Sequence, residues 1–361
     1  MGLLAASTSL CVVLVGFAVA RKLRRDRREA AMLARRRRFA ALARCGSLPA
    51  LTAQLRRAVR SQPARIDLAV ALQQAAPGLD RARRDVLRQA AVAARLDRAL
   101  VRGLGSRDPV VRATAVLLLS RLRLDGVQRL LGPLVGDPDG DVRLVAVRAL
   151  AELADAPAAR VLIDALAAGL LPPERLVERL GAPWAVEPIL QRLQEPGKPA
   201  NHATPIAASP TGAVRRPLRA WLATALGLAA DQRAEPALLA LLRTGGAEER
   251  VSAARALATA GSAEAVPDLR AALADSEWPV RAQAARSLGR LGGADAVPAL
   301  ARLLSDRAWW VRANAAEALR QLGEPGLAAL RAALDHHDRY ARDRAREALA
   351  LQQLAEAEVP S

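Results

Sequence analysis

Histidine and cysteine are the side chains that most readily bind metal ions or act in catalysis, and the chain has only three His and two Cys. Cys11 and Cys45 have neither the number nor the spacing of a disulfide framework or a metal site. His336 and His337 follow Leu334 in a predicted turn, where we expect solvent exposure rather than metal binding. The sequence also lacks a glycine-rich phosphate loop and a Ser/His/Asp arrangement at motif spacing. We therefore predict no catalytic residue, no metal and no cofactor.

Aromatic residues are the other candidates for function, because Trp and Tyr are enriched at protein–protein interfaces. The chain has five Trp, two Phe and one Tyr, yet Trp309 and Trp310 stand side by side, directly before Val311 and Arg312. The elements that position this pair must be established first.

The stretch after the Trp pair is repeated along the chain. Val followed by Arg, or a looser copy of it, precedes an alanine-rich run, and the copies recur at a nearly constant interval. A fixed period of about 30 residues is typical of stacked repeats. The equivalent positions are Val111, Val142, Val251, Val280, Val311 and Ala341.

Each unit is predicted to be a helical hairpin. Apolar residues recur at helical spacing over 280–291, and glycines at 292–293 end that helix. A second apolar run covers 297–304, with Pro298 in its first turn. Two short helices cannot bury their apolar faces alone, so neighbouring units must stack. The sequence therefore predicts an all-α fold, an α-solenoid of helical hairpins.

The unit resembles the short bacterial HEAT-like repeats, of the kind also found in phycobilisome lyases. The shared pattern is Asp, a short turn, Val-Arg, an alanine-rich helix, Leu-Gly and a leucine-rich helix. The match is good over 106–169 and 214–352 and weaker over 47–105 and 170–193. It implies the fold and says little of function, because such repeats serve enzymes, scaffolds and adaptors.

Arginine recurs at one place in the repeat. Asp137, Asp275 and Asp306 each lie six residues before such an arginine, which predicts an Arg–Asp ladder that ties the turns of adjacent repeats. The alternative is that the arginines form a binding ridge. The predicted members are Arg112, Arg143, Arg219, Arg281, Arg312 and Arg342.

The same alignment predicts a stripe of aromatic residues. Trp278 and Trp309 lie two residues before the Val position, and Trp310 and Tyr340 lie one before it. Three successive turns would then present these side chains along one edge, as an interface for a protein partner. The alternative is that each Trp packs over the end of the preceding helix pair.

Charge is concentrated near the N-terminus. Residues 21–105 hold 22 Lys and Arg against 6 Asp and Glu, whereas residues 106–361 hold 32 against 30. A nucleic-acid-binding array would carry basic charge along many repeats. The near-neutral repeats therefore favour no nucleic-acid partner.

The first residues have the composition of a membrane anchor. Residues 3–20 have no charged side chain and would span about 27 Å as a helix. The basic block 21–44 follows, which predicts one transmembrane helix with the N-terminus outside and the rest in the cytoplasm. A cleavable signal peptide is the alternative, because Ala-Val-Ala at 18–20 resembles a cleavage site. Residues predicted to set topology or contact anionic lipid are Arg21, Lys22, Arg24, Arg25, Arg27, Arg28, Arg35, Arg36, Arg37 and Arg38.

The repeats divide into two predicted sub-arrays, 47–193 and 218–355. Between them, residues 194–217 are rich in Pro and show no helical periodicity. We interpret this insertion as a flexible linker, with a partner-docking loop as the alternative.

A HEAT-repeat enzyme is the main rival class. Resemblance to deoxyhypusine hydroxylase would imply a di-iron centre held by His-Glu pairs. His202, His336 and His337 are followed by Ala, His and Asp, so that ligand set is missing. With phycobilisome lyases the chain shares only the short repeat.

These observations predict a non-catalytic, single-pass protein of the bacterial inner membrane, whose cytoplasmic solenoid docks a protein partner. The chain resembles bacterial membrane-anchored HEAT-repeat proteins, for which a membrane-bound glycosyltransferase is one plausible partner. No small-molecule substrate is evident.

Overall fold

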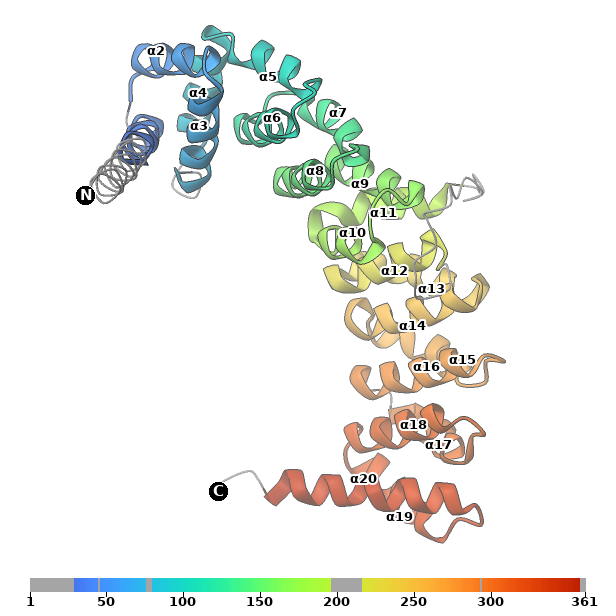
Figure 1. Ribbon diagram of the computed structural model, residues 1–361. Coiled ribbons are helices and arrows are strands. Elements are labelled where there is room, and N and C mark those ends of the chain that lie inside the picture. The colour runs from blue at the N-terminus through green and yellow to red at the C-terminus, as the bar shows by residue number, and fades with distance from the viewer. Residues whose placement is uncertain (1–28, 45, 76–79, 196–215, 293, 358–361) are drawn as a thin grey trace, which may run out of the picture. The chain divides into compact units, whose positions relative to one another are not determined.

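A computed structural model of the protein describes residues 29–44, 46–75, 80–195, 216–292 and 294–357. All regular structure in these ranges is helical, and they contain no strand (Figure 1). None of the helices within them is long and apolar enough to span a bilayer. The predicted anchor at 3–20 and most of the predicted insertion at 194–217 lie outside the described residues.

The chain forms two compact units, Met1–Leu153 and Ala154–Ser361. This boundary does not coincide with the predicted division of the repeats at 194–217. In unit 1, α2 packs on α4, and α6 packs on α3, α5 and α8. Its helices are a first helix over 29–44, then α2 (Leu48–Val59), α3 (Gln62–Ala75), α4 (Arg81–Ala93), α5 (Leu96–Leu104), α6 (Pro109–Leu122), α7 (Val127–Leu131) and α8 (Gly140–Leu153).

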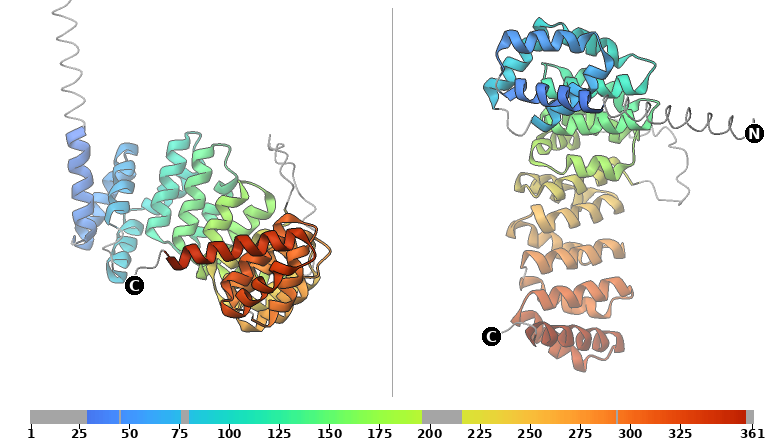
Figure 2. Two further views of the ribbon diagram at one scale, coloured as in Figure 1. Left: turned by 90° about the horizontal axis from the view of Figure 1, so that it is seen from below. Right: turned by 60° about the vertical axis from the view of Figure 1, so that its left-hand side comes forward.

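Unit 2 is a stack of helical hairpins in two layers (Figure 2). The first helices of successive hairpins, from α12 to α20, pack on one another, and the second helices form the other layer. The helices are α9 (Ala156–Ala168), α10 (Pro173–Leu180), α11 (Pro183–Gln194), α12 (Leu218–Ala229), α13 (Glu235–Thr244), α14 (Ala247–Ala260), α15 (Val266–Ala272), α16 (Trp278–Leu291), α17 (Val297–Arg302), α18 (Trp309–Gln321), α19 (Glu324–Ala332) and α20 (Arg339–Ala357).

The core lies between the two layers, where leucine from both helices meets the alanine-rich faces. Val280, Val311 and Ala341, the repeated position before the arginine, are fully buried. This burial removes apolar surface from water and favours the stack. The predicted all-α fold of stacked hairpins is confirmed.

The register of α14 differs from the prediction. Glu249, rather than Val251, takes the buried place that Val280 has in the next repeat. The Glu249 carboxylate accepts the N–H of Gly246 at 3.2 Å, which satisfies a charged group at an otherwise apolar position. The interval between equivalent buried positions, from Glu249 to Val280, is therefore two residues longer than the interval from Val251 to Val280 that the sequence suggested. The sequence pointed to Val251 because an acidic residue stands where the other repeats have valine.

Glycine allows the first helices to approach closely. A Cβ on Gly227 of α12 would lie 2.8 Å from the Ala256 Cα of α14. Gly289 of α16 occupies the same place two repeats later, and a Cβ there would lie 2.8 Å from the Ala318 Cα of α18. Both contacts are with backbone, which cannot move aside as a flexible side chain can.

Gly289→Ala is therefore expected to destabilise unit 2 by about 1–3 kcal/mol, because the added methyl group must push α16 and α18 apart. Urea unfolding followed by circular dichroism measures the change. Gly105→Ala is the control, since its Cβ would meet only the Arg102 carbonyl oxygen at 3.8 Å. Equal unfolding midpoints for the two variants would contradict the close-approach explanation.

Candidate protein-binding edge

An arginine–aspartate pair joins neighbouring repeats, and we call each such pair a rung. Nε and Nη2 of Arg281, near the start of α16, donate to the two carboxylate oxygens of Asp306 at 2.8 and 3.0 Å. Their side chains are only 9% and 8% exposed. Arg250 of α14 holds Asp275 in the same way, at 2.8 and 2.9 Å. In each rung the aspartate lies in the turn before the next first helix.

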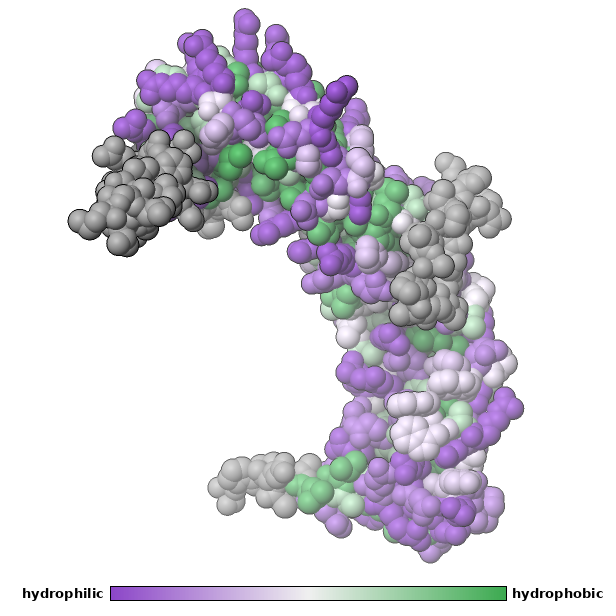
Figure 3. Space-filling view, viewed as in Figure 1, coloured by the Kyte–Doolittle hydropathy of each residue, from purple (hydrophilic) through white to green (hydrophobic). Residues whose placement is uncertain are grey.

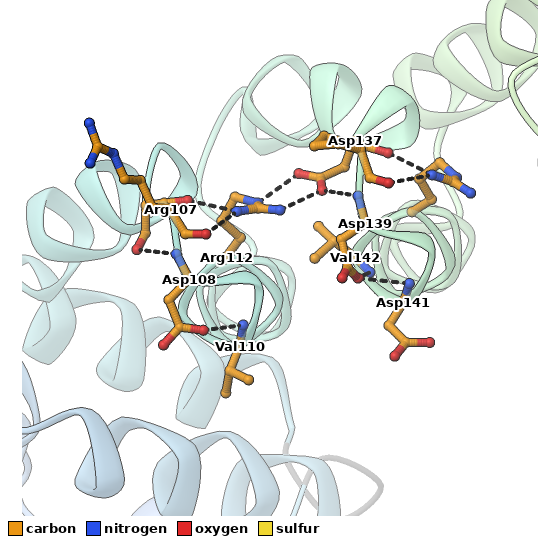
Figure 4. Close-up of polar contacts among 11 residues, drawn as sticks. Arg107, Asp108, Val110, Arg112, Asp137, Asp139, Asp141 and Val142 are labelled. Atoms are coloured by element: carbon orange, nitrogen blue, oxygen red, sulfur yellow. Dashed lines mark hydrogen bonds and ion pairs between the residues drawn. The ribbon is translucent and has the colours of Figure 1, made fainter.

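Unit 1 contains the same rung, between Arg112 and Asp137 (Figure 4). The two hydrogen bonds measure 2.8 and 2.7 Å. One carboxylate oxygen of Asp137 also accepts the N–H of Asp139 at 2.9 Å, a local bond that shapes the turn. The Asp137 carbonyl oxygen accepts Nη1 of Arg143 at 2.8 Å. One aspartate thus fixes the preceding repeat, its own turn and its own first helix.

The direction of the rungs differs from the sequence prediction. The arginine six residues after each aspartate donates to the aspartate's backbone carbonyl: Arg281 to Asp275 and Arg312 to Asp306, both at 2.8 Å. The carboxylate itself binds the arginine of the preceding repeat. The residue types of the ladder were predicted, but their side-chain pairing was not.

Arg250 is the rung residue that sequence reasoning missed. Its signal was present, because Arg219, Arg250, Arg281 and Arg312 are evenly spaced, at the same interval that separates Val280 from Val311. Arg219 shares this register but makes no rung, since Thr244 stands where the aspartate of the following turn would be. The Arg219 side chain is 49% exposed, and its nearest carboxylate oxygen, from Glu249, is 3.7 Å away.

The two remaining predicted arginines bind backbone only. Nη1 of Arg143 donates to the carbonyls of Asp137 and Pro138, and its Nε is buried without a hydrogen-bond partner. Nη1 of Arg342 donates to the carbonyls of His336 and His337 at 2.7 and 2.9 Å.

The rungs keep their carboxylates ionised. The hydrogen bond from Arg112 lowers the pKa of Asp137. Burial is the largest single influence on Asp275 and Asp306 and raises the pKa of each, but the arginine hydrogen bond, the backbone hydrogen bond and the nearby arginine charges together outweigh it, so the pKa of each is lowered. Because the folded-state pKa is depressed, the rungs stabilise the protein above the ordinary aspartate pKa of about 3.9, and this contribution is lost as the pH falls through the folded-state value.

His336 replaces the aspartate of the last turn. Its Nδ1 accepts the N–H of Asp338 at 3.0 Å, as an Asp306 carboxylate oxygen accepts the N–H of Ala308 at 2.8 Å. A single imidazole nitrogen cannot also receive both donors of a guanidinium. Arg312 therefore keeps only its carbonyl bonds, and its Nε is buried without a hydrogen-bond partner.

Four residues form what we call the aromatic edge: Trp278, Trp309, Trp310 and Tyr340. They occupy the first or second residues of α16, α18 and α20, which pack side by side. Their exposed fractions are 44%, 48%, 58% and 49%, so each places about half of its surface in solvent. The indoles of Trp309 and Trp310 are perpendicular, with ring centroids 4.6 Å apart.

Arginines lie over the faces of two of these rings. The guanidinium of Arg312, which has no carboxylate partner, stacks on Tyr340 at 4.7 Å, and Arg339 lies over the same ring at 5.1 Å. Arg344 of α20 lies over Trp309 of α18 at 5.7 Å. The arrangement combines apolar faces with cations, which is the composition of a protein-binding hot spot.

Two of the basic residues predicted to set topology or to contact lipid bind a buried carboxylate of the protein itself. Nε of Arg35 and Nε of Arg36 both donate to the buried carboxylate of Asp67 on α3, at 2.7 and 3.0 Å. Arg37 and Arg38 are exposed. The other predicted residues, from Arg21 to Arg28, lie outside the described residues.

A metal site is not seen in the part of the chain that the structure describes, which holds no cluster of three or more His, Cys, Asp or Glu able to bind an ion. The rings of His336 and His337 stack at 4.2 Å. His337 is exposed and His336 is half-buried. His202, Cys11 and Cys45 fall outside the described ranges.

Comparison with known proteins identifies the repeats. The family model of HEAT repeats matches residues 98–196, 213–281 and 268–350. No curated protein matches the sequence. Among solved structures, human deoxyhypusine hydroxylase in complex with glycerol is 23% identical, with 72% of this chain and 96% of that chain covered and a TM-score of 0.30.

Two further solved structures are similar. An engineered protein is 22% identical, with 90% of this chain and 95% of that chain covered and a TM-score of 0.36. Kap121p bound to Nup53p is 15% identical, with 84% of this chain covered and a TM-score of 0.38. This chain spans 45% of the length of Kap121p.

Arg281→Ala is expected to destabilise unit 2 by about 3 kcal/mol, since it leaves the buried Asp306 carboxylate without its partner. Arg312→Ala removes no carboxylate pair and should cost about 1 kcal/mol. Thermal and urea unfolding measure both, with the exposed Arg290→Ala as control. Equal losses for Arg281→Ala and Arg312→Ala would show that the carboxylate contributes nothing.

His336→Asp is expected to stabilise the last junction by about 1–2 kcal/mol, because a carboxylate at this turn can accept Nε and Nη2 of Arg312. The urea midpoint measures the gain. His337→Asp adds the same charge at the neighbouring position and is the matched control. A gain shared by the control would point to net charge rather than to a completed rung.

Proposed function

Since the chain belongs to the HEAT-repeat family, we propose that it is a non-catalytic scaffold whose unit 2 binds a partner protein through the aromatic edge. The observation that carries the proposal is the exposure of Trp278, Trp309, Trp310 and Tyr340, at 44–58%. Half of the eight aromatic residues in the sequence stand on this edge. Large apolar side chains grouped in water usually mark a binding surface.

The geometry of the edge supports a protein partner. Trp309 and Trp310 present perpendicular rings, so a partner side chain can contact the face of one and the edge of the other. Neighbouring arginines on Tyr340 and Trp309 add hydrogen-bond donors at the rim. Aromatic and arginine side chains contribute most of the binding energy at many protein interfaces.

The proposal includes attachment to the bacterial inner membrane, with the repeats in the cytoplasm. The apolar segment 3–20 and the basic block 21–44 support it. A membrane-bound enzyme such as a glycosyltransferase is then a fitting partner, as the resemblance to membrane-anchored HEAT-repeat proteins implies. The sequence has no His-Glu pair, so we favour the scaffold function over that of a deoxyhypusine-hydroxylase-like oxidoreductase.

Each of three single substitutions, Trp309→Ala, Trp310→Ala and Trp278→Ala, is expected to weaken partner binding by about 2 kcal/mol, near thirtyfold. The free energy of unfolding of each variant should stay within about 0.5 kcal/mol of the parent value. Crosslinking and affinity recovery from membranes of the source cell measure binding, and thermal melting measures stability. Leu228→Ala, which removes an exposed apolar side chain of α12 outside the edge, is the control. Collapsed melting of all three Trp variants, or undiminished recovery, would refute the interface.

A further inference from the structure

The first helices of unit 1 carry a large excess of positive charge. Residues 29–105 hold 16 Arg against five Asp and Glu, a balance of +11. Few of these arginines are used internally: Arg35 and Arg36 bind Asp67, Arg83 binds three carbonyls at the C-terminal end of the first helix, and Arg88 binds Asp85.

The remaining exposed arginines are not neutralised. None of them forms an ion pair with another described residue, in contrast to Arg243 and Arg331 of unit 2, which have carboxylate partners. Hydrophilic side chains project outward over this part of unit 1 (Figure 3). The unpaired arginines are Arg37, Arg38, Arg44, Arg56, Arg57, Arg60, Arg81, Arg84, Arg95, Arg98 and Arg102.

Three of them gather at α5. Arg98 and Arg102 are four residues apart on one side of the helix, and Arg95 directly precedes its first residue. With Val101 and Asp97 they line a shallow surface hollow. Asp97 subtracts one charge and its Oδ1 is buried without a hydrogen-bond partner, so the hollow keeps a balance of +2. We call this group the α5 arginine face.

Both anionic membranes and nucleic acids bind arginine-rich surfaces, and the neighbouring residues favour the membrane. Val101 and Val92 are 41% and 54% exposed among the arginines, and Leu48 is 39% exposed. Aliphatic side chains can enter the lipid interface. Buried Phe39 is the only aromatic residue in 29–105, so this segment offers no ring on which bases could stack.

We propose that the α5 arginine face, together with the exposed arginines around it, binds the phosphate headgroups of an anionic bilayer. A guanidinium donates two parallel hydrogen bonds to a phosphate, and Val101 enters the headgroup layer between them. The inference deepens the proposed membrane attachment. It rests on unit 1 and is independent of the aromatic edge.

The test is arginine footprinting of the full-length protein on vesicles. Protein bound to phosphatidylcholine vesicles, or to vesicles in which about a third of the lipid is anionic phosphatidylglycerol, is treated with p-hydroxyphenylglyoxal, and modification is quantified by mass spectrometry. Anionic lipid is expected to slow modification of Arg95, Arg98 and Arg102 at least about threefold, since each arginine gains roughly fivefold in binding at such a surface. Arg270, Arg290 and Arg302, exposed on unit 2, should react equally in both vesicles.

A charge-matched pair of variants tests the role of the face. Arg95→Gln/Arg98→Gln/Arg102→Gln should reduce the lipid-dependent protection of Arg81 and Arg84 on the adjacent α4, and Arg270→Gln/Arg290→Gln/Arg302→Gln should not. Equal modification of the α5 arginines on both vesicles overturns the proposal. So does protection by a short DNA duplex in place of anionic vesicles. Partner recovery through the aromatic edge would persist in either case, so this failure is distinct from failure of the scaffold function.

Discussion

The bidentate hydrogen bond from an arginine to the aspartate of the following turn is the contact that fixes one repeat against the next. Alanine-rich helices pack through small, smooth surfaces. Such surfaces bury apolar area but do not fix the position of one helix along the axis of its neighbour. Arg281 removes that freedom, because its Nε and Nη2 bind Asp306 and its Nη1 binds two carbonyls of its own turn. All these donors are satisfied at once in only one register, and the desolvation of a nearly buried charge pair is offset only there.

The sequence predicted the hairpins and their period because these depend on local patterns. Apolar residues at helical spacing and glycine at the helix ends act over a few residues. The rungs join residues that are far apart in the chain. These residues come together only after the second helix of the hairpin has run back antiparallel to the first and the next turn has formed. From sequence the aspartate six residues away looked like the partner, whereas the fold assigns its carboxylate to the repeat before. Glu249 at a valine position concealed Arg250 for a similar reason, since the burial of Glu249 depends on a hydrogen bond from the Gly246 N–H and on the guanidinium of Arg219, 3.7 Å away.

The surface position of the aromatic residues was also beyond the sequence. Trp278 and Trp309 are the first residues of their helices, where no preceding turn exists for the indole to pack against. The indole ring then either packs against a side chain of the next repeat or remains in solvent. Which of these occurs depends on how far successive first helices are offset, and Gly289 and the rungs set that offset. The alternatives of packing and exposure could not be separated until the stack was known.

The incomplete rung and the aromatic edge occur at the same junction. Arg112, Arg250 and Arg281 each direct a guanidinium to a carboxylate, but Arg312 faces a turn in which histidine replaces aspartate and the interval is one residue shorter. Its guanidinium has no carboxylate to bind and stacks instead on the ring of Tyr340, so a cation lies against an exposed aromatic side chain. A buried donor without a partner costs stability that the junctions with a complete rung do not lose. Departure from a rule that the same chain obeys elsewhere is expected where a surface serves binding rather than folding, which agrees with the binding surface proposed at the aromatic edge.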